Sequence, residues 1–182
     1  MIFDRTSMIS KWIVSAFLAA SCATHAQIIS VQEDPNRGCR IDPAEWVGMH
    51  QQDLVLQLGA EQNITLPVGM ADESDERRAG YQWVCPKQAE NTAILFPFSG
   101  EIDTAFHMRN VYVPLNIIFF DAQGGLVDKL WMSPEANTEG QPQYYRPSGP
   151  FKFALEMTES FTASRLVNAE VLSLNLAASG LL

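Results

Sequence analysis

The sequence predicts a mainly β fold, a small barrel or sandwich with one or two short helices, behind an N-terminal signal peptide. Short segments of alternating or continuous apolar residues recur along the chain, and glycine and proline turns separate them. Few stretches have helical periodicity. The 182 residues are 47% hydrophobic and 18% charged, which is typical of a globular chain rather than a disordered one.

The first 26 residues have the three parts of a secretory signal peptide. Arg5 and Lys11 supply a positive flank, an apolar run follows over residues 12–20, and small residues lead to Ala26. The apolar run is about half of the roughly 20 residues that a spanning helix needs. We therefore expect cleavage after Ala26 and export to the periplasm or the medium. Two alternatives stay open: a lipoprotein signal that lipidates Cys22, and a retained anchor.

The predicted organisation is a signal peptide over 1–26, an extended lead-in over 27–52, one β domain over 53–175 and a C-terminal tail over 176–182. Cleavage would leave 10 of the 12 basic and 20 of the 21 acidic residues. A chain this acidic gains nothing from the counterion release that drives binding to phosphate backbones. We therefore expect no nucleic-acid partner, and no transmembrane span in the mature chain because no further apolar stretch is long enough.

Two cysteines, Cys39 and Cys85, remain after the predicted cleavage. In an oxidising compartment such a pair indicates a disulfide that ties the N-terminal segment to the domain. The loop between them would contribute roughly 4 kcal/mol on chain-entropy arguments. The alternative is a pair of buried free thiols. No Cys-x-x-Cys occurs, so redox chemistry of the thioredoxin kind has no support.

The first part of the β domain is expected to contain two strands and a helix. Residues 53–58 alternate between polar and apolar, and residues 63–68 form a second strand whose Pro67 favours an edge or a bulge. A short helix follows within 71–80. Asp72 can cap its free amides, acids fill the first turn, and Gly80 ends it.

The second part is expected to contain further strands, a hairpin, a long loop and a short helix. Apolar segments flanking a Gly-Gly turn indicate the hairpin, and four prolines indicate the loop. The expected elements are a strand over 93–98, a hairpin of 112–121 with 126–132, a loop over 134–150, a strand over 151–157, a helix over 160–167 and a closing strand over 171–174.

The residues that common catalytic and metal sites require are missing. After cleavage the chain has two histidines, His50 and His107, without the spacing of zinc ligands. No Gly-x-Ser-x-Gly and no phosphate-binding glycine loop occurs. We therefore predict no catalytic residue, no metal site and no cofactor.

The polar cluster around residue 108 is the best candidate for a ligand-binding site. In a strand His107 and Arg109 share one face, while Asn110 points to the other. Asn110 could then bond to a buried Glu156 or Arg77, and the ion pair to look for is Arg77 with Glu156, because a lone buried charge is costly. The alternative is a buried network that fixes the hairpin register.

Tyr144 and Tyr145, with Arg146, lie inside the predicted loop. Aromatic residues and arginine are enriched in contact surfaces, so this segment suits a binding loop. The alternative is a loop that packs its aromatic rings onto the sheet.

Several blocks of the chain resemble the DUF192 family. Ala71-Asp72 with Glu76-Arg77 and Gly80 is similar to its Ala-Asp-x-x-x-Glu-Arg-x-x-Gly entry, and residues 94–98 to its Met-Leu-Phe-x-Phe strand. Residues 106–111 resemble its Trp-Met-Lys-Asn-Thr segment, and residues 114–121 its Pro-Leu-Asp-Ile-Ile-Phe-Ile-Asp hairpin. The resemblance runs from about 53 to 174. It implies a compact β-rich fold, often behind an export signal, and a biochemical role that is not established.

The departures from that family's pattern lower the expectation of catalysis. Asn116 stands where the family has Asp, and an amide neither titrates nor carries charge. His107 stands where it has Trp, and Arg109 where it has Lys. We expect an exported ligand-binding or accessory module of the cell envelope, whose partner is an unknown small ligand or an envelope protein. The alternative is a hydrolase-like enzyme that uses His107 and scattered carboxylates.

Overall fold

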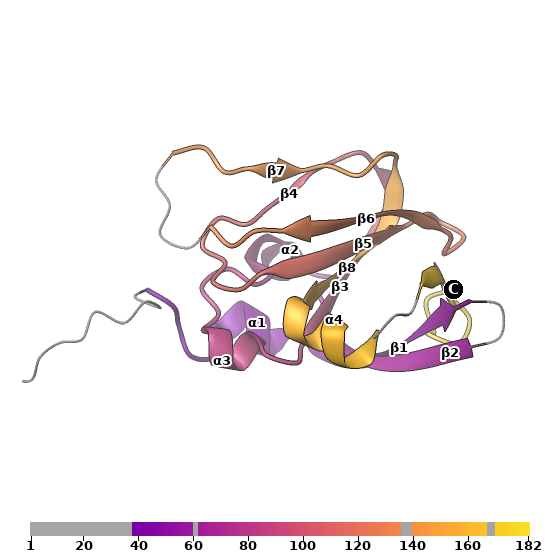
Figure 1. The fold of residues 1–182 in the computed structure, drawn as a ribbon, viewed down its shortest axis with the longest axis horizontal. Coiled ribbons are helices and arrows are strands. Elements are labelled where there is room, and N and C mark those ends of the chain that lie inside the picture. The colour runs from indigo at the N-terminus through magenta and orange to yellow at the C-terminus, as the bar shows by residue number, and fades with distance from the viewer. Residues whose placement is uncertain (1–37, 60–61, 136–139, 167–169) are drawn as a thin grey trace, which may run out of the picture. The chain divides into compact units, whose positions relative to one another are not determined.

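The computed structural model describes residues 38–59, 62–135, 140–166 and 170–182. The predicted signal peptide, the cleavage site after Ala26, Cys22 and the first part of the lead-in lie outside these residues. Within the described ranges the chain forms nine strands and four short helices (Figure 1), which confirms a mainly β fold. The prediction of one or two helices was too low.

The described fold is built from short strands and short helices. In chain order they are α1 (Ala44–Gly48), β1 (His50–Leu58), β2 (Gln62–Met70), α2 (Ser74–Ala79), α3 (Pro86–Ala89), β3 (Ala93–Ile102), β4 (Phe106–His107), β5 (Leu115–Phe120), β6 (Leu126–Met132), β7 (Tyr144–Tyr145), β8 (Phe151–Thr158), α4 (Glu159–Arg165) and β9 (Val171–Leu174). The predicted strands and the predicted hairpin are all present. Strands β1, β2, β3 and β8 are longer than predicted, β6 and β9 match, and β5 is shorter than the predicted 112–121.

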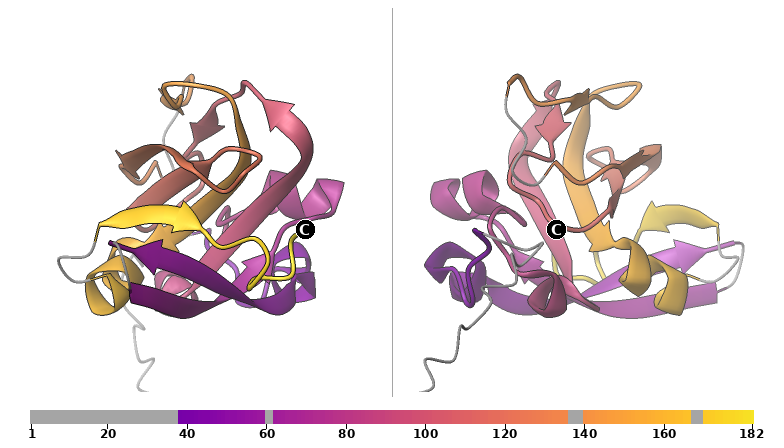
Figure 2. Two further views of the ribbon diagram at one scale, coloured as in Figure 1. Left: turned by 90° about the vertical axis from the view of Figure 1, so that its right-hand side faces the viewer. Right: turned by 60° about the vertical axis from the view of Figure 1, so that its left-hand side comes forward.

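Seven strands form one sheet in the order β6-β5-β8-β3-β2-β1-β9, and β4 pairs with β7 in a second, two-stranded sheet. Only β2 and β3 run parallel; the other neighbours are antiparallel. The large sheet curls into a half-barrel (Figure 2). Its two ends meet where Ser173 of β9 bridges Gly125 in the β5–β6 turn, and Leu174 N donates to Gly124 O at 2.7 Å.

Buried and more exposed residues alternate along strands β1 and β2, because only the inner face of these strands is covered. Leu54, Leu56 and Leu58 are buried while the residues between them are partly exposed. Pro67 lies inside β2, where it pairs with Asp53 of β1. The parallel pairing with β3 begins only at Gly69, so the missing N–H of Pro67 falls where β2 has a single neighbour.

The central strands β3, β5 and β8 are buried on both faces, which explains their continuous apolar runs. The inner face carries one core cluster, and the outer face carries a second one covered by β4, β7 and the α2–α3 region. Adjacent residues of β8 divide between them: Leu155 belongs to the inner cluster, Ala154 to the outer. Full burial of each large apolar side chain contributes about 1.5–3 kcal/mol.

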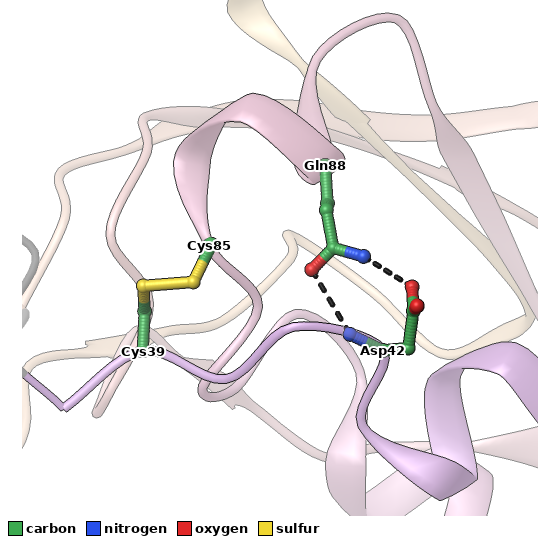
Figure 3. The surroundings of a disulfide bond; sticks show 4 residues. All are labelled: Cys39, Asp42, Cys85 and Gln88. Carbon is green, nitrogen blue, oxygen red and sulfur yellow. Dashed lines mark hydrogen bonds between the residues drawn. A yellow bond between two sulfur atoms is a disulfide. The ribbon is translucent and has the colours of Figure 1, made fainter.

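The disulfide joins Cys39 to Cys85 as predicted and attaches the N-terminal segment beside α3 (Figure 3). Gln88 reinforces this attachment: its amide oxygen accepts from Asp42 N at 3.1 Å, and its amide nitrogen donates to the Asp42 carboxylate. Residues 38–52 are the described part of the predicted lead-in. They contain α1, which the sequence pattern did not predict.

The C-terminal segment after β9 packs against β1. The Ser179 hydroxyl is buried and accepts a hydrogen bond from Val55 N at 2.9 Å, and Gln52 donates to Ser179 O. Leu176 and Leu181 pack against the inner core cluster. Among the described residues, no helix has the length and apolarity to span a membrane.

Candidate functional site

Glu156 is the one acidic side chain inside the core of the described sheet. It lies in the middle of β8, opposite Ile94 of β3 and Ile117 of β5, and is only 5% exposed. Burial raises the pKa of its carboxyl to about 8, because the charged form loses its hydration. The acid is therefore mostly protonated at neutral pH.

No hydrogen bond or ion pair reaches the Glu156 carboxyl from the described part of the chain. The predicted ion pair with Arg77 does not form. Arg77 Nη1 donates instead to the backbone carbonyls of Ala71, at 3.4 Å, and of Asp72. No side-chain nitrogen or oxygen among the described residues is both fully buried and without a partner, so the Glu156 oxygens keep access to solvent, where a ligand can also reach them.

Tyr81 lies close to Glu156 but does not donate a hydrogen bond to its carboxyl. Its buried hydroxyl is 3.0 Å from Thr92 Oγ1, and Thr92 gives its own hydroxyl hydrogen to Ala89 O at 2.7 Å. Tyr81 must therefore be the donor to Thr92, because each hydroxyl has a single hydrogen. Burial raises the pKa of Tyr81 far above its ordinary value, so the phenol stays neutral.

Glu156 lines a cleft of about 320 Å³, which we call the Glu156 cleft. This volume is at the small end of ligand sites, which span about 300–1,000 Å³. The buried polar lining residues, Glu156 and Tyr81, form its floor. Its mouth is lined by more exposed side chains: Arg77, Arg78, Gln82, Thr104 and His107.

Aromatic rings make up the sides of the Glu156 cleft. Phe96 of β3 and Phe106 of β4 meet edge to face, with ring centroids 5.5 Å apart, and Phe98 packs edge to face on Phe151 at 5.7 Å. Phe98 and Phe106 are only partly buried. Their contacts fix the rings while leaving apolar surface in the cleft.

Helix α2 supplies the basic side of the mouth. Its N-cap is Glu73, not the predicted Asp72, and a reciprocal capping box joins Glu73 to Glu76. Gly80 ends the helix as predicted, at φ +46°, with its N–H donating to Glu76 O. Arg77 and Arg78 in the last turn therefore point to the cleft, where they also match the negative end of the helix dipole.

His107 lies on β4 and lines the Glu156 cleft. Its Nδ1 accepts a hydrogen bond from Arg109 N at 3.3 Å, and its ring meets Tyr144 edge to face. Tyr144 is 61% exposed, whereas Tyr145 is buried and its hydroxyl accepts from Ser133 N at 3.0 Å. Neither tyrosine lines this cleft; they pair with His107 and Phe106 in the β4–β7 ladder.

Arg109 and Asn110 lie outside the Glu156 cleft. Arg109 is exposed and its Nη2 donates to Gly140 O at 2.6 Å. Asn110 has a left-handed backbone with φ +61°, its O accepts from Trp83 N at 2.8 Å, and its amide donates to Gln82 Oε1 at 3.4 Å. Asn110 thus holds Gln82, a residue of the mouth, and reaches neither Glu156 nor Arg77 directly.

The family's Asp position, Asn116 in this chain, belongs to a different surface. Asn116 pairs with Met157 on β8, so its side chain is on the opposite face of the sheet from Glu156. Its amide donates to Thr162 Oγ1 of α4 at 3.3 Å. The change from Asp to Asn therefore leaves the Glu156 cleft unaffected.

The described residues contain no group of three or more His, Cys, Asp or Glu side chains that could hold a metal ion. Of the predicted ligand-binding residues, Glu156, Arg77 and His107 share one cleft, and Arg109, Asn110, Tyr144 and Tyr145 do not line it. The sequence pattern did not indicate that Gly80 and the aromatic side chains of the cleft belong to the site. A single charge inside the apolar run of residues 153–157 was the one signal that could have located the floor.

Comparison with known proteins gives a family and a fold. Two solved structures are similar to this chain, each at 17% identity over 69% of it. One is a candidate transcription regulator from Sinorhizobium meliloti (TM-score 0.56, 92% of that protein covered), and the other a protein of unknown function from Novosphingobium aromaticivorans (TM-score 0.53, 85% covered). No curated protein matches the chain in sequence. The family model of DUF192, described as an uncharacterized ACR, matches residues 55–171. The chain is therefore a member of the DUF192 family.

Proposed function

We propose that this protein is an exported module of the cell envelope that binds a small ligand in the Glu156 cleft. The observation that carries the proposal is the carboxyl of Glu156, buried, without a hydrogen-bond partner, and lining a cleft of about 320 Å³. No side-chain nitrogen or oxygen among the described residues is both fully buried and without a partner, so the Glu156 oxygens reach the open space of the cleft. A ligand in the cleft can therefore hydrogen-bond to them.

The surroundings of Glu156 support a binding role. Apolar rings around a few polar groups are the usual lining of small-molecule sites, since the rings provide contact area and the polar groups fix orientation. Phe98 and Phe106 provide the rings, and Gln82 and His107 provide polar groups at the mouth. Asn110 and the backbone of Arg109 hold these two polar side chains in place.

Export is supported by the leader pattern of residues 1–26 and by the disulfide between Cys39 and Cys85. Disulfides persist mainly in oxidising compartments such as the periplasm or the medium. The predicted domain organisation, with the leader removed and one β domain retained, agrees with this proposal.

An acid–base enzyme is the second candidate, and it rests on the raised pKa of Glu156 in the same cleft as His107. A carboxylic acid held neutral near pH 7 can act as a general acid. Such an enzyme would turn over a substrate, and the Glu156→Gln variant would bind that substrate without converting it. A binding module loses affinity in the same variant and converts nothing.

A thermal-shift screen tests the binding proposal. The panel contains sugars, peptidoglycan fragments, small anions, amines and divalent metals. A ligand at 100 times its dissociation constant adds about 2.7 kcal/mol, or about 5–10 °C for a domain of this size. Glu156→Gln should abolish the shift. Glu90→Gln, an exposed carboxyl outside the cleft, should preserve it.

A second variant separates the Glu156 cleft from the polar cluster at residues 109–110. Arg109→Ala combined with Asn110→Ala should lower stability but retain the ligand-induced shift, because neither side chain lines the cleft. A shift that is lost in this variant and retained in Glu156→Gln would place the ligand elsewhere and refute the proposal. So would a panel without any hit.

A further inference from the structure

The Glu156 carboxyl faces the open space of the cleft and can accept a hydrogen bond from a donor outside the protein. Tyr81 uses its hydrogen on Thr92, and Arg77 uses Nη1 on two backbone carbonyls. The carboxyl therefore has free acceptor positions, and an amine is the ligand group that satisfies a carboxylate most strongly, through charge-assisted hydrogen bonds.

The sides of the cleft accept an apolar body. Phe96, Phe98, Phe106 and Val111 line it with apolar side chains. Phe96 and Phe106 hold each other edge to face, so the aromatic surface is fixed before a ligand arrives. Ring faces also attract cations, which favours an ammonium group that passes them on its way to Glu156.

The mouth of the cleft favours an acidic group. Glu156 is the only acid among the lining residues, whereas Arg77 and Arg78 both line the mouth. Arg78 is 74% exposed and 3.3 Å from Asp75. An exposed pair of this kind is weak, so a ligand acid can compete with Asp75 for the guanidinium.

We propose that the ligand of the Glu156 cleft carries an amino group at one end of an apolar body and an acidic group at the other. The amino group bonds to Glu156, the body contacts the phenylalanine rings, and the acid faces Arg77 and Arg78. This inference rests on the proposed function, since it names the ligand class of that same cleft.

Binding of such a ligand should displace the proton of Glu156. The ammonium arrives already protonated, so the carboxyl loses its proton to solvent when the ion pair forms. The other titratable or charged groups that line the cleft are Tyr81, Arg77, Arg78 and His107. Burial raises the pKa of Tyr81 far above its ordinary value, so its phenol keeps its proton at neutral pH. Glu156→Gln isolates the contribution of Glu156 from that of the other lining residues.

The test compares three probes by titration calorimetry at pH 7, using the disulfide-bonded protein. The probes are ε-aminocaproate, which has both end groups, hexylamine, which lacks the acid, and caproate, which lacks the amine. Two buffers with different ionisation enthalpies report the protons released. We expect ε-aminocaproate to bind tightest, caproate weakest, and close to one proton to leave per ε-aminocaproate bound.

Paired variants assign the two ends of the probe. Glu156→Gln should weaken ε-aminocaproate binding about tenfold or more and abolish proton release. Arg78→Gln should weaken it about two- to fivefold and leave hexylamine unchanged. Glu90→Gln and Lys87→Gln, exposed residues outside the cleft, should bind all probes like the unmodified protein. Circular dichroism of each variant confirms its fold.

Three results would overturn the inference: caproate binding as tightly as ε-aminocaproate, Glu156→Gln retaining full affinity, or no probe binding. The thermal-shift panel then decides the proposed function separately. A hit of another chemical class that Glu156→Gln abolishes would keep the cleft as a ligand site with a different ligand. An empty panel would remove both proposals.

Discussion

Gly80 and Glu156 approach each other across the floor of the cleft. A Cβ atom at position 80 would lie 3.7 Å from Glu156 Oε2 and 3.5 Å from Phe96 Cζ. The left-handed backbone at Gly80, with φ +46°, brings the end of α2 down to this carboxyl. The turn that ends the helix is therefore also the turn that shapes the binding floor.

Gly80→Ala should destabilise the protein and narrow the cleft. The backbone at residue 80 is strained for any side chain, which costs about 1–3 kcal/mol. The new methyl group would also lie between Phe96 and Glu156. Urea denaturation measures the stability, and the ligand-induced thermal shift measures the cleft. Gly100→Ala is the control, because its Cβ would meet nothing within 4 Å and its φ is not positive; equal effects in both variants would contradict the account.

The stability of the protein should fall as the pH rises through the range set by Glu156. Burial raises its pKa from 4.5 to about 8, so the folded state holds a proton that the unfolded state has released. The contribution of Glu156 to stability is therefore full below pH 4.5, declines between about 4.5 and 8, and levels off above that. The total loss is several kcal/mol.

The variant Glu156→Gln isolates this effect from other titrating groups. Its free energy of unfolding, measured against urea at several pH values, should exceed that of the unmodified protein above pH 8 and lack the decline. If the difference between the two proteins did not change with pH, Glu156 would not be the buried acid of this account.

Reduction of the Cys39–Cys85 disulfide should lower stability by about 2–4 kcal/mol, since the bridge closes a loop with a sequence separation of 46 residues. Thermal unfolding with and without reductant measures the loss, and the Cys39→Ser, Cys85→Ser double variant should match the reduced protein. Mass spectrometry of the exported protein should show a two-proton difference on reduction. Two free thiols before reduction would disprove the bridge.

Ser179→Ala should destabilise the domain by about 1–3 kcal/mol, because Val55 N would lose its buried hydrogen-bond acceptor. The matched control is Ser99→Ala, an exposed serine of β3, which should be nearly neutral. Chemical denaturation of both variants gives the comparison. A neutral Ser179→Ala would mean that the segment after β9 does not support β1.

The elements that were predicted correctly are those whose sequence pattern lies within a few neighbouring residues. The hairpin of β5 and β6 follows from two apolar segments around Gly124-Gly125, and α2 follows from acids, arginines and Gly80 in order. The missed helices α1 and α3 have five and four residues, too few for a hydrophobic period. The β4–β7 ladder joins residues nearly 40 apart, and only the folded sheet brings them together.

The candidate site was predictable only in part for the same reason. Glu156, Arg77 and His107 were recognisable as unusual polar residues, but their common cleft depends on packing among α2, β3, β4 and β8. The expected Arg77–Glu156 pair failed because backbone carbonyls of Ala71 and Asp72, six and five residues before Arg77, lie within its reach. The Arg77 guanidinium therefore donates to these nearby carbonyls and not to the Glu156 carboxyl, which is distant in sequence.

The most direct test of the account is the titration of the Glu156 carboxyl itself. Carbon-13 NMR of protein with labelled glutamate follows each side-chain carboxyl with pH, and the signal missing from Glu156→Gln is that of Glu156. The account predicts a midpoint near 8 in the free protein and a lower one when ε-aminocaproate is bound. A midpoint close to the ordinary 4.5 in the free protein would show a solvated or partnered carboxyl, and would contradict the central claim.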